Sequence, residues 1–281
     1  MKFGINSLLF TSPFTTQHTR LFKQFKQWGF DAVEIAFEDP SLIDAPKVRA
    51  ALDRAELACC AICGIFGPDR DLRGDKQQQK NCLQYLAATV DAAVILGAPV
   101  IIGPVYSAVG RANAYSPQER KAQWKTVANN LKQACAYAEP KGIAFAVEPL
   151  NRFETDFINT CEQVMQMIRD VDSSALKVHL DTFHMNIEEK DSAAAILRAG
   201  KHLAHFHACG CDRGVPGDDH IAWPDIARAL KKIKYDGAVV IESFSQEIEV
   251  IAKAAAIWRK LAPSQKELAV RGLKFLKKTL G

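Results

Sequence analysis

The sequence lacks the features that mark several large classes of protein. Nothing in its 281 residues approaches the ~18 consecutive apolar residues that a membrane helix needs. The start, MKFGINSLLFTSPF, has only a short apolar part and no small-residue cleavage site, so we expect no signal peptide. Lysine and arginine are spread along a chain of formal net charge +4, with no basic cluster interleaved with aromatic residues. We therefore expect a cytoplasmic protein whose partners include neither a membrane nor a nucleic acid.

Two binding signatures are also missing. The chain contains no G-x-G-x-x-G and no P-loop, the glycine-rich turns that hold phosphate groups. Among the eight cysteines, Cys60 and Cys63 form a C-x-x-C, but no second pair follows at the spacing of a zinc ribbon. In a long chain without a secretion signal, we expect reduced, buried thiols rather than disulfides.

What the sequence does contain is a regular alternation of short apolar runs and longer helical patterns. Eight runs are predicted as strands: KFGIN (2–6), DAVEIA (31–36), ELACCAIC (56–63), PVIIGP (99–104), IAFAVE (143–148), LKVHLD (176–181), LAHFHA (203–208) and AVVIES (238–243). Helix start signals lie between several of them. Ser116 to Glu119 is a capping box with proline at the first helical position, Thr160 and Gln163 form a second box, and Asp191 precedes a helical pattern that stops at Gly200.

Eight strand-and-helix units in one chain, without a low-complexity linker, predict a single α/β domain over residues 1–281. Near-continuous apolar strands are typical of parallel sheets that are covered on both faces. The prediction is a (β/α)8 TIM barrel with an extra C-terminal helix, which we place at 265–280 outside the barrel. An open doubly wound sheet is the alternative, and the lack of a phosphate-binding turn disfavours it.

Four of the predicted strands end in a possible metal ligand: Glu148, Asp181, His207 and Glu242. In a TIM barrel the carboxyl ends of all strands lie at one face, where active sites are found. Three carboxylates in one dry cleft need a compensating charge, because otherwise some would take up a proton. Three oxygen ligands and one nitrogen ligand suit Mn²⁺, Mg²⁺ or Co²⁺ better than zinc. Any one of these residues could be a strand-end group satisfied by a loop amide, but four on successive strands favour a metal site.

Two further histidines precede these ligands. His179 and His205 each lie two residues before a predicted ligand, so strand alternation places them on the same face. We predict that they are core residues and not ligands.

The strings around these residues resemble a known family. They are AVEPLNRFETD (146–156), HLDTFHMNIEE (179–189), HFHACGCDRGVPG (205–217), VIESFSQEI (240–248) and IWR (257–259). They resemble the ketose 3-epimerases, the group of D-tagatose, D-allulose (psicose) and L-ribulose 3-epimerases among the xylose isomerase-like barrels.

The resemblance implies an isomerase with one divalent metal ion, Mn²⁺ in first place and Co²⁺ or Mg²⁺ as alternatives. It implies that Glu148, Asp181, His207 and Glu242 bind the ion and that Glu148 and Glu242 are also the catalytic acid and base. It further implies that Glu154, His184 and Arg213 hold the O1 to O3 end of the sugar, and that the protein is a homodimer or homotetramer.

The implied reaction is epimerisation at C3 of a free ketose, either a ketohexose or a ketopentose. Chelation of O2 and O3 by the metal would polarise the C2 carbonyl and stabilise a cis-enediolate. One glutamate would take the C3 proton from one face of the sugar, and the other would return a proton to the opposite face.

Three other functions stay open at this point. An aldose–ketose isomerase or a hydroxypyruvate isomerase could use the same metal site. An abasic-site endonuclease of the same superfamily would need additional histidines at the ends of strands three and four, where the sequence offers Cys63 and Gly103. A non-catalytic sugar-binding barrel would not need two proton-transfer carboxylates on a metal.

Overall fold

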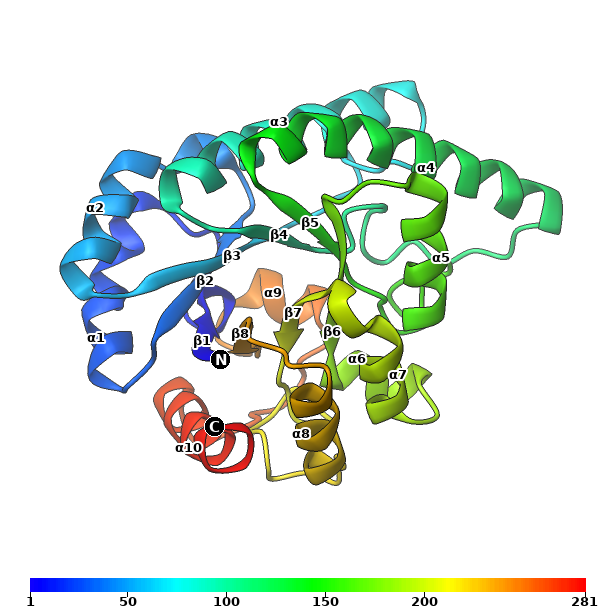
Figure 1. Ribbon diagram of the computed structural model, residues 1–281. Helices are drawn as coiled ribbons and strands as arrows, with labels where there is room; N and C mark the ends of the chain where they lie inside the picture. Colours follow the sequence, from blue (N-terminus) through cyan, green and yellow to red (C-terminus); the bar gives the residue numbers. More distant parts are fainter.

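The computed structural model describes residues 1–281 and contains a closed barrel of eight parallel strands in sequential order (Figure 1). The strands are β1 (Lys2–Asn6), β2 (Ala32–Phe37), β3 (Ala58–Gly64), β4 (Val100–Gly103), β5 (Ala144–Val147), β6 (Leu176–Asp181), β7 (Leu203–His207) and β8 (Ala238–Ile241). All eight predicted strands are present, and the predicted TIM barrel is confirmed. Glu148 and Glu242 lie one residue beyond the ends of β5 and β8.

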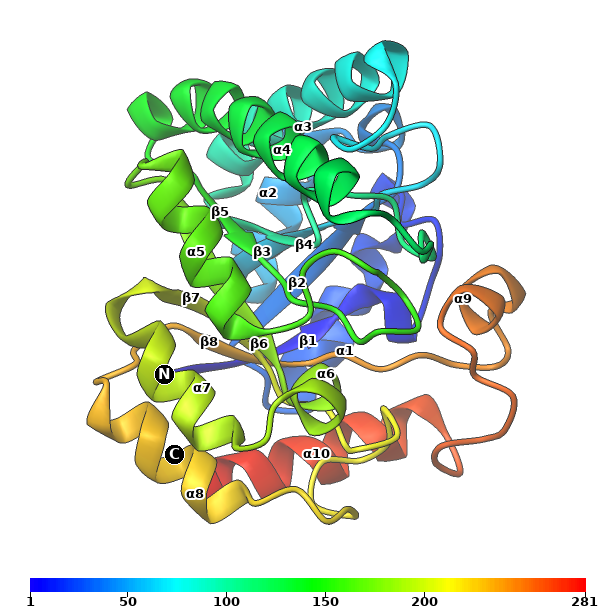
Figure 2. The same ribbon diagram turned by 90° about the vertical axis from the view of Figure 1, so that its right-hand side faces the viewer.

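Helices surround the barrel (Figures 1 and 2). They are α1 (Leu21–Gln27), α2 (Ala45–Ala55), α3 (Lys76–Leu96), α4 (Pro117–Ala138), α5 (Cys161–Val171), α6 (Thr182–Glu188), α7 (Ser192–Ala199), α8 (Trp223–Lys232), α9 (Glu249–Ala254) and α10 (Gln265–Leu280). The C-terminal helix α10 lies outside the barrel as predicted, and it contacts β1, β8 and α8. It therefore completes the ring of helices as the long helix that follows β8. The short helices α6, before α7, and α9, before α10, are additional to one helix per strand.

The predicted capping residues begin their helices. The side chain of Ser116 accepts a hydrogen bond from the backbone of Glu119 at the start of α4, and Thr160 caps α5 in the same way through Gln163. Asp191 accepts from the backbone N–H of Ala194 at the start of α7. Each cap satisfies one of the backbone donors that a helix start leaves without an intrahelical partner.

The barrel interior changes from apolar to polar along the strands. Small apolar side chains fill the part near the strand starts, where Ala32, Cys60, Ala238 and Val240 form one cluster. Side chains alternate between the two faces of a strand, so Glu34 on β2 lies on the same inner face as Ala32, further along. The larger apolar cluster lies between the strands and the helices.

None of the helices has both the length and the apolar character that are needed to cross a membrane.

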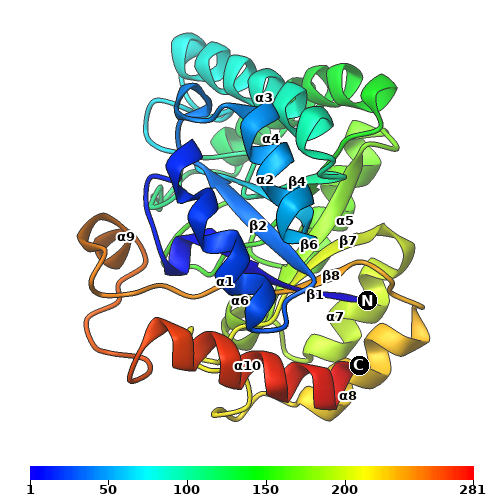
Figure 3. The same cartoon turned by 90° about the vertical axis from the view of Figure 1, so that its left-hand side faces the viewer.

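The two ends of the barrel differ in what they carry. The strands run towards the end where α9 projects, whereas both chain termini lie at the opposite end (Figures 2 and 3). All eight cysteines are free thiols, and every one except Cys211 is buried.

Candidate active site

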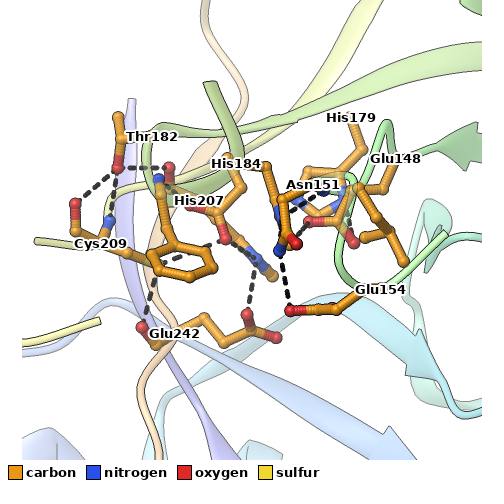
Figure 4. A network of polar contacts seen from close by, with 12 residues as sticks. Glu148, Asn151, Glu154, His179, Thr182, His184, His207, Cys209 and Glu242 are labelled. Atoms are coloured by element: carbon orange, nitrogen blue, oxygen red, sulfur yellow. Dashed lines mark hydrogen bonds and ion pairs between the residues drawn. The ribbon is translucent and has the colours of Figure 1, made fainter. Parts of the chain in front are cut away.

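The four predicted metal ligands converge at the carboxyl end of the barrel. Nδ1 of His207 lies 3.7 Å from Oδ2 of Asp181 and 3.6 Å from Oε2 of Glu242. Ligand atoms of Glu148, Asp181 and His207 all lie within 4.8 Å of one another. All four residues are buried, and Figure 4 shows the side chains of Glu148, His207 and Glu242 within one polar network.

Two polar atoms of this cluster lack a partner. Oε1 of Glu148 and Nδ1 of His207 are buried and make no hydrogen bond. Because the large majority of buried polar side-chain atoms in proteins are hydrogen-bonded, each unpaired atom calls for an explanation. Three carboxylates and one imidazole supply the oxygen and nitrogen donors that a hard divalent cation takes. The residues present therefore fit a metal ion.

The charges in the cluster shift the acidities of its members. Burial raises the pKa of Glu148 well above its usual range, and the neighbouring Glu242 and Asp181 add to this effect. For His207 burial acts in the opposite direction, but Glu34 and Glu242 raise the pKa of the imidazole well above its usual value. The pKa of Asp181 is lowered although burial opposes this, because His207 and His184 lie nearby. Without a metal ion, the cluster therefore retains protons on Glu148 and His207.

The three residues predicted to hold the sugar lie beside this cluster. Nη2 of Arg213 is 3.3 Å from Oε1 of Glu154 and 3.3 Å from Nε2 of His184. Nε2 of His184 is in turn 3.8 Å from Oε1 of Glu148. The structure thus brings all seven predicted site residues together at one rim.

Arg213 is held in an unusual backbone conformation. Its φ angle is +63°, in the left-handed region that costs a non-glycine residue about 1–3 kcal/mol. Its guanidinium lies over the rings of Phe183 and Phe244, 4.1 Å and 4.8 Å from their centroids. The two rings and Glu154 fix the direction of the guanidinium at the mouth of the barrel.

Asn151 connects His184 with Glu154, although it was not among the predicted site residues. Its backbone N–H donates to Nδ1 of His184 at 3.0 Å, and its side-chain amide donates to Oε1 of Glu154 at 2.9 Å. Nδ1 of His184 thus accepts from Asn151, and Nε2 is the ring nitrogen that faces Arg213 and Glu148. The signal in the sequence is the position of Asn151 inside the string NRFE.

Two other buried residues at the site were missed. Glu34 lies within the predicted strand 31–36, where an inward-facing glutamate in an apolar run was the available signal. Its Oε1 is 2.9 Å from Nε2 of His207. Sγ of Cys209 lies 3.4 Å from Oδ2 of Asp181 and 2.9 Å from the backbone oxygen of Glu242, so its single S–H has two acceptors within reach.

His179 and His205 are buried among these residues, on the same face as the predicted ligands. Nδ1 of His179 is 3.6 Å from Oε2 of Glu148, and neither of its ring nitrogens makes a hydrogen bond. Nε2 of His205 is 2.5 Å from Oε2 of Glu34. His205 thus has a carboxylate partner, whereas His179 is a buried ring without a hydrogen bond.

The ends of β3 and β4 offer no further histidine ligands. β3 and β4 end at Gly64 and Gly103, and Gly103 has a φ angle of +113° that only glycine adopts easily. His220, which follows β7, forms a hydrogen bond with Asn186 and does not contact the cluster. The ends of β3 and β4 thus lack the additional histidines that an abasic-site endonuclease would need.

The profile of the xylose isomerase-like TIM barrels matches residues 22–279. The chain belongs to this family. Within it, the chain is 35% identical to a Synechocystis protein named "Probable ketose 3-epimerase", over 99% of this chain and 96% of the relative. It is 31% identical to the ketose 3-epimerase of Arthrobacter globiformis, over 100% of this chain and 97% of the relative.

A solved structure of the family has the same overall fold. The D-allulose 3-epimerase from Methylomonas sp., in complex with D-allulose, aligns with a TM-score of 0.92 at 27% identity and covers 99% of this chain and 97% of its own. The resemblance to ketose 3-epimerases is confirmed by these relatives, and so is the enzyme class, an isomerase of the epimerase type.

Proposed function

We propose that this member of the xylose isomerase-like TIM barrels epimerises a free ketose at C3, with a ketohexose or ketopentose as substrate. One observation carries the proposal: the unpaired atoms of Glu148 and His207 lie in a buried carboxylate cluster, directly beside His184. The residues proposed to bind the metal and those proposed to bind the sugar thus share one rim. The names of the relatives support a ketose as the substrate class.

Glu148, Asp181, His207 and Glu242 would hold the metal ion, for which Mn²⁺ is our first choice and Co²⁺ or Mg²⁺ are alternatives. When bound, a divalent ion would polarise the C2 carbonyl of the ketose and stabilise negative charge on the cis-enediolate. The oxygen-rich donor set supports this choice of metals.

Glu148 and Glu242 would move the protons. They follow β5 and β8, so they reach the cluster from different sides of the barrel mouth. One carboxylate takes the C3 proton, and the other returns a proton to the opposite face of the carbon, which inverts the configuration. Oε1 of Glu148 has no hydrogen bond to break before it receives a proton.

His184, Arg213 and Glu154 would orient the sugar. Nε2 of His184 and the guanidinium of Arg213 would face the sugar oxygens at C1 to C3, with Arg213 as a donor, and Glu154 would accept from a hydroxyl group. Asn151 would fix both His184 and Glu154 through its hydrogen bonds to them. Such positioning lowers the barrier because the reacting carbon is held against the proton-transfer groups before the reaction begins.

A substrate panel tests the proposal. The metal-stripped protein is incubated with D-fructose, D-tagatose, D-allulose and L-ribulose, each with and without Mn²⁺, and the products are separated by chromatography. We expect C3-epimeric ketoses only when the metal is present. Aldoses as the sole products would instead indicate an aldose–ketose isomerase, and full turnover after exhaustive chelation would contradict the metal.

We further propose a homodimer or homotetramer, as the family resemblance implies. Exposed apolar side chains support a contact surface, since Phe153 and Trp258 are 74% and 72% exposed. Light scattering coupled to size-exclusion chromatography measures the mass, and a monomeric mass would contradict the proposal. The cytoplasmic location and the lack of nucleic-acid partners stay predictions.

A further inference from the structure

One buried carboxylate contacts the predicted metal ligands without being one of them. Glu34 on β2 is fully buried. Its Oε1 and Oε2 lie 2.9 Å and 3.2 Å from Nε2 of His207. Oε2 also contacts Nε2 of His205 at 2.5 Å, and Oε1 accepts from the side-chain amide of Asn6 at 2.5 Å. Two histidines and one amide therefore surround this single carboxylate.

The two nitrogens of His207 face different groups. Nε2 faces Glu34, whereas Nδ1 faces Asp181 and Glu242 and makes no hydrogen bond. Glu34 as an ionised acceptor requires a proton on Nε2 of His207, which leaves the lone pair of neutral His207 on Nδ1. That nitrogen points to the carboxylates of the cluster.

Strand alternation points Glu34 into the barrel, on the same inner face as Ala32. The register of β2 with β3 shifts between Val33 and Glu34, and the additional residue, Cys60, belongs to β3, so β2 keeps its regular alternation through Glu34. Burying a charged carboxylate is costly unless it is paired, and here His205, His207 and Asn6 pair it.

A purely structural role for Glu34 would involve His205 and Asn6 alone. The contact with Nε2 of His207 goes beyond such a role, because His207 contacts Glu34 through one ring nitrogen and faces Asp181 and Glu242 through the other. Asn6 also reaches the cluster, since its amide donates to Oε1 of Glu242 at 3.4 Å. Metal-bound histidines almost always donate their other ring N–H to a carboxylate, carbonyl or water, which fixes ring orientation and increases ligand basicity.

We propose that Glu34 is a positioning residue for the metal site: it holds His207 with the proton on Nε2 and directs Nδ1 towards the ion. This inference rests on the proposed metal site. Glu34, His207 and Glu242 also lie close enough together to hold an ion, but both oxygens of Glu34 already contact His205, His207 or Asn6. We therefore assign Glu34 a role through His207 and not as a ligand.

Metal binding by the Glu34→Gln variant tests the inference. The metal-stripped wild type and variant are titrated with Mn²⁺ by calorimetry, and we expect the variant to bind about 10- to 100-fold more weakly. The matched control is Asp71→Asn, which neutralises another buried carboxylate that pairs with Arg111 outside the cluster. The control should lose thermal stability and keep the Mn²⁺ affinity of the wild type.

The outcomes separate the two proposals. Equal Mn²⁺ affinity in the wild type and Glu34→Gln would overturn the role of Glu34 and leave the metal site intact. No Mn²⁺ binding by the wild type would overturn both. Weaker binding that also occurs in Asp71→Asn would mean that lost stability explains the effect, and would overturn the role of Glu34.

A measurement on the wild type covers the case in which Glu34→Gln does not fold. In ¹⁵N-histidine-labelled protein loaded with Mg²⁺, nuclear magnetic resonance should detect a slowly exchanging Nε2–H on His207. The expected signal is a protected ring N–H bonded to a carboxylate. A His207 ring whose Nε2 carries no proton would overturn the inference.

Discussion

Glu148 illustrates how burial and neighbouring charge act on one carboxyl group. The residue is 5% exposed, and its Oε1 lies 3.8 Å from Nε2 of His184. Desolvation disfavours the ionised form, and the carboxylates of Glu242 and Asp181 disfavour it further, so the pKa rises. A cation in the cluster would act in the opposite direction, because it stabilises the ionised form.

Metal binding should therefore depend on pH. In the metal-free protein the raised pKa values of Glu148 and His207 keep protons on both groups to a higher pH than in free side chains. An incoming Mn²⁺ must displace these protons, so the apparent Kd should fall as the pH rises. Calorimetry in two buffers of different ionisation enthalpy measures the protons released. A Kd that does not change with pH would contradict this assignment.

Removing the carboxylate of Glu148 should abolish most of the activity. In Glu148→Gln the amide cannot accept the C3 proton, and we expect kcat to fall by about 10²- to 10⁴-fold, the usual contribution of a general acid or base. The measurement is epimer formation at saturating ketose and Mn²⁺. As a control, Glu188→Gln changes a half-buried glutamate that pairs with Arg152 beyond the site and should keep the wild-type kcat.

Arg213 should be sensitive even to lysine. Lysine lacks the planar guanidinium that stacks on Phe183 and Phe244, so Arg213→Lys should lose a charge-assisted contact worth about 1.5–3 kcal/mol, or about 10- to 100-fold in kcat/KM. Steady-state kinetics on the ketose that reacts fastest measure this loss. The exposed Arg259 provides the matched control, and Arg259→Lys should leave kcat/KM unchanged. A similar loss in both variants would argue against a specific role for Arg213.

At the scale of secondary-structure elements, Thr182 links the ends of β6 and β7. Its Oγ1 donates to the backbone oxygen of Cys209 at 2.6 Å and accepts from the backbone N–H of Cys209 at 2.7 Å. Thr182 is also the first residue of α6 and directly follows Asp181. One buried hydroxyl thus holds the segment after His207 against the segment after Asp181.

Replacing this hydroxyl by a methyl group should destabilise the protein. In Thr182→Val the buried backbone N–H of Cys209 loses its acceptor, and an unpaired buried group costs about 1–3 kcal/mol. The control is Thr89→Val in α3, where the lost hydroxyl only donates to the backbone oxygen of Tyr85. Urea unfolding of both variants measures the difference, and equal losses would contradict the linking role.

The elements that the sequence predicted are those with local signals. Hydrophobic runs located all eight strands, and the side chains of Ser116, Thr160 and Asp191 located three helix starts. The short helices α6 and α9 were not predicted, because each is shorter than the window in which helical periodicity is visible.

The predicted site followed from one topological rule, the meeting of strand ends at one face of the barrel, and from the family resemblance. No such rule predicts that Glu34 and Asn151 belong to the site. Glu34 and Asn151 act through contacts with residues 173 and 33 positions away in the chain. Closure of the barrel brings β2 and β7 together across its interior, and the path of the loop after β5 places Asn151. Neither can be deduced from spacing.

At the scale of the whole molecule, the buried thiols link stability to pH. Burial raises the pKa of Cys135 to about 11 and the pKa values of Cys59 and Cys161 to about 12. In the unfolded chain a thiol ionises with a pKa of about 8.5. Between these values the unfolded state binds fewer protons than the folded state, so the free energy of unfolding decreases as pH rises.

We therefore expect full stability from these thiols below about pH 8.5 and a progressive loss between about pH 9 and about pH 12. Urea unfolding at a series of alkaline pH values under reducing conditions measures this loss. Cys135→Ala should reduce the slope, since one thiol with a raised pKa is removed. An unchanged slope in Cys135→Ala would contradict the assignment.

The positions of Met1 and Gly281 have a practical consequence. Both lie at the far end of the barrel from α9 and from the carboxyl ends of the strands (Figure 2). A resin, an electrode or a fused carrier joined through either residue would therefore lie away from the end of the barrel that carries Glu148 and His184. Immobilisation through either terminus should leave the candidate active site on the side that faces the solution.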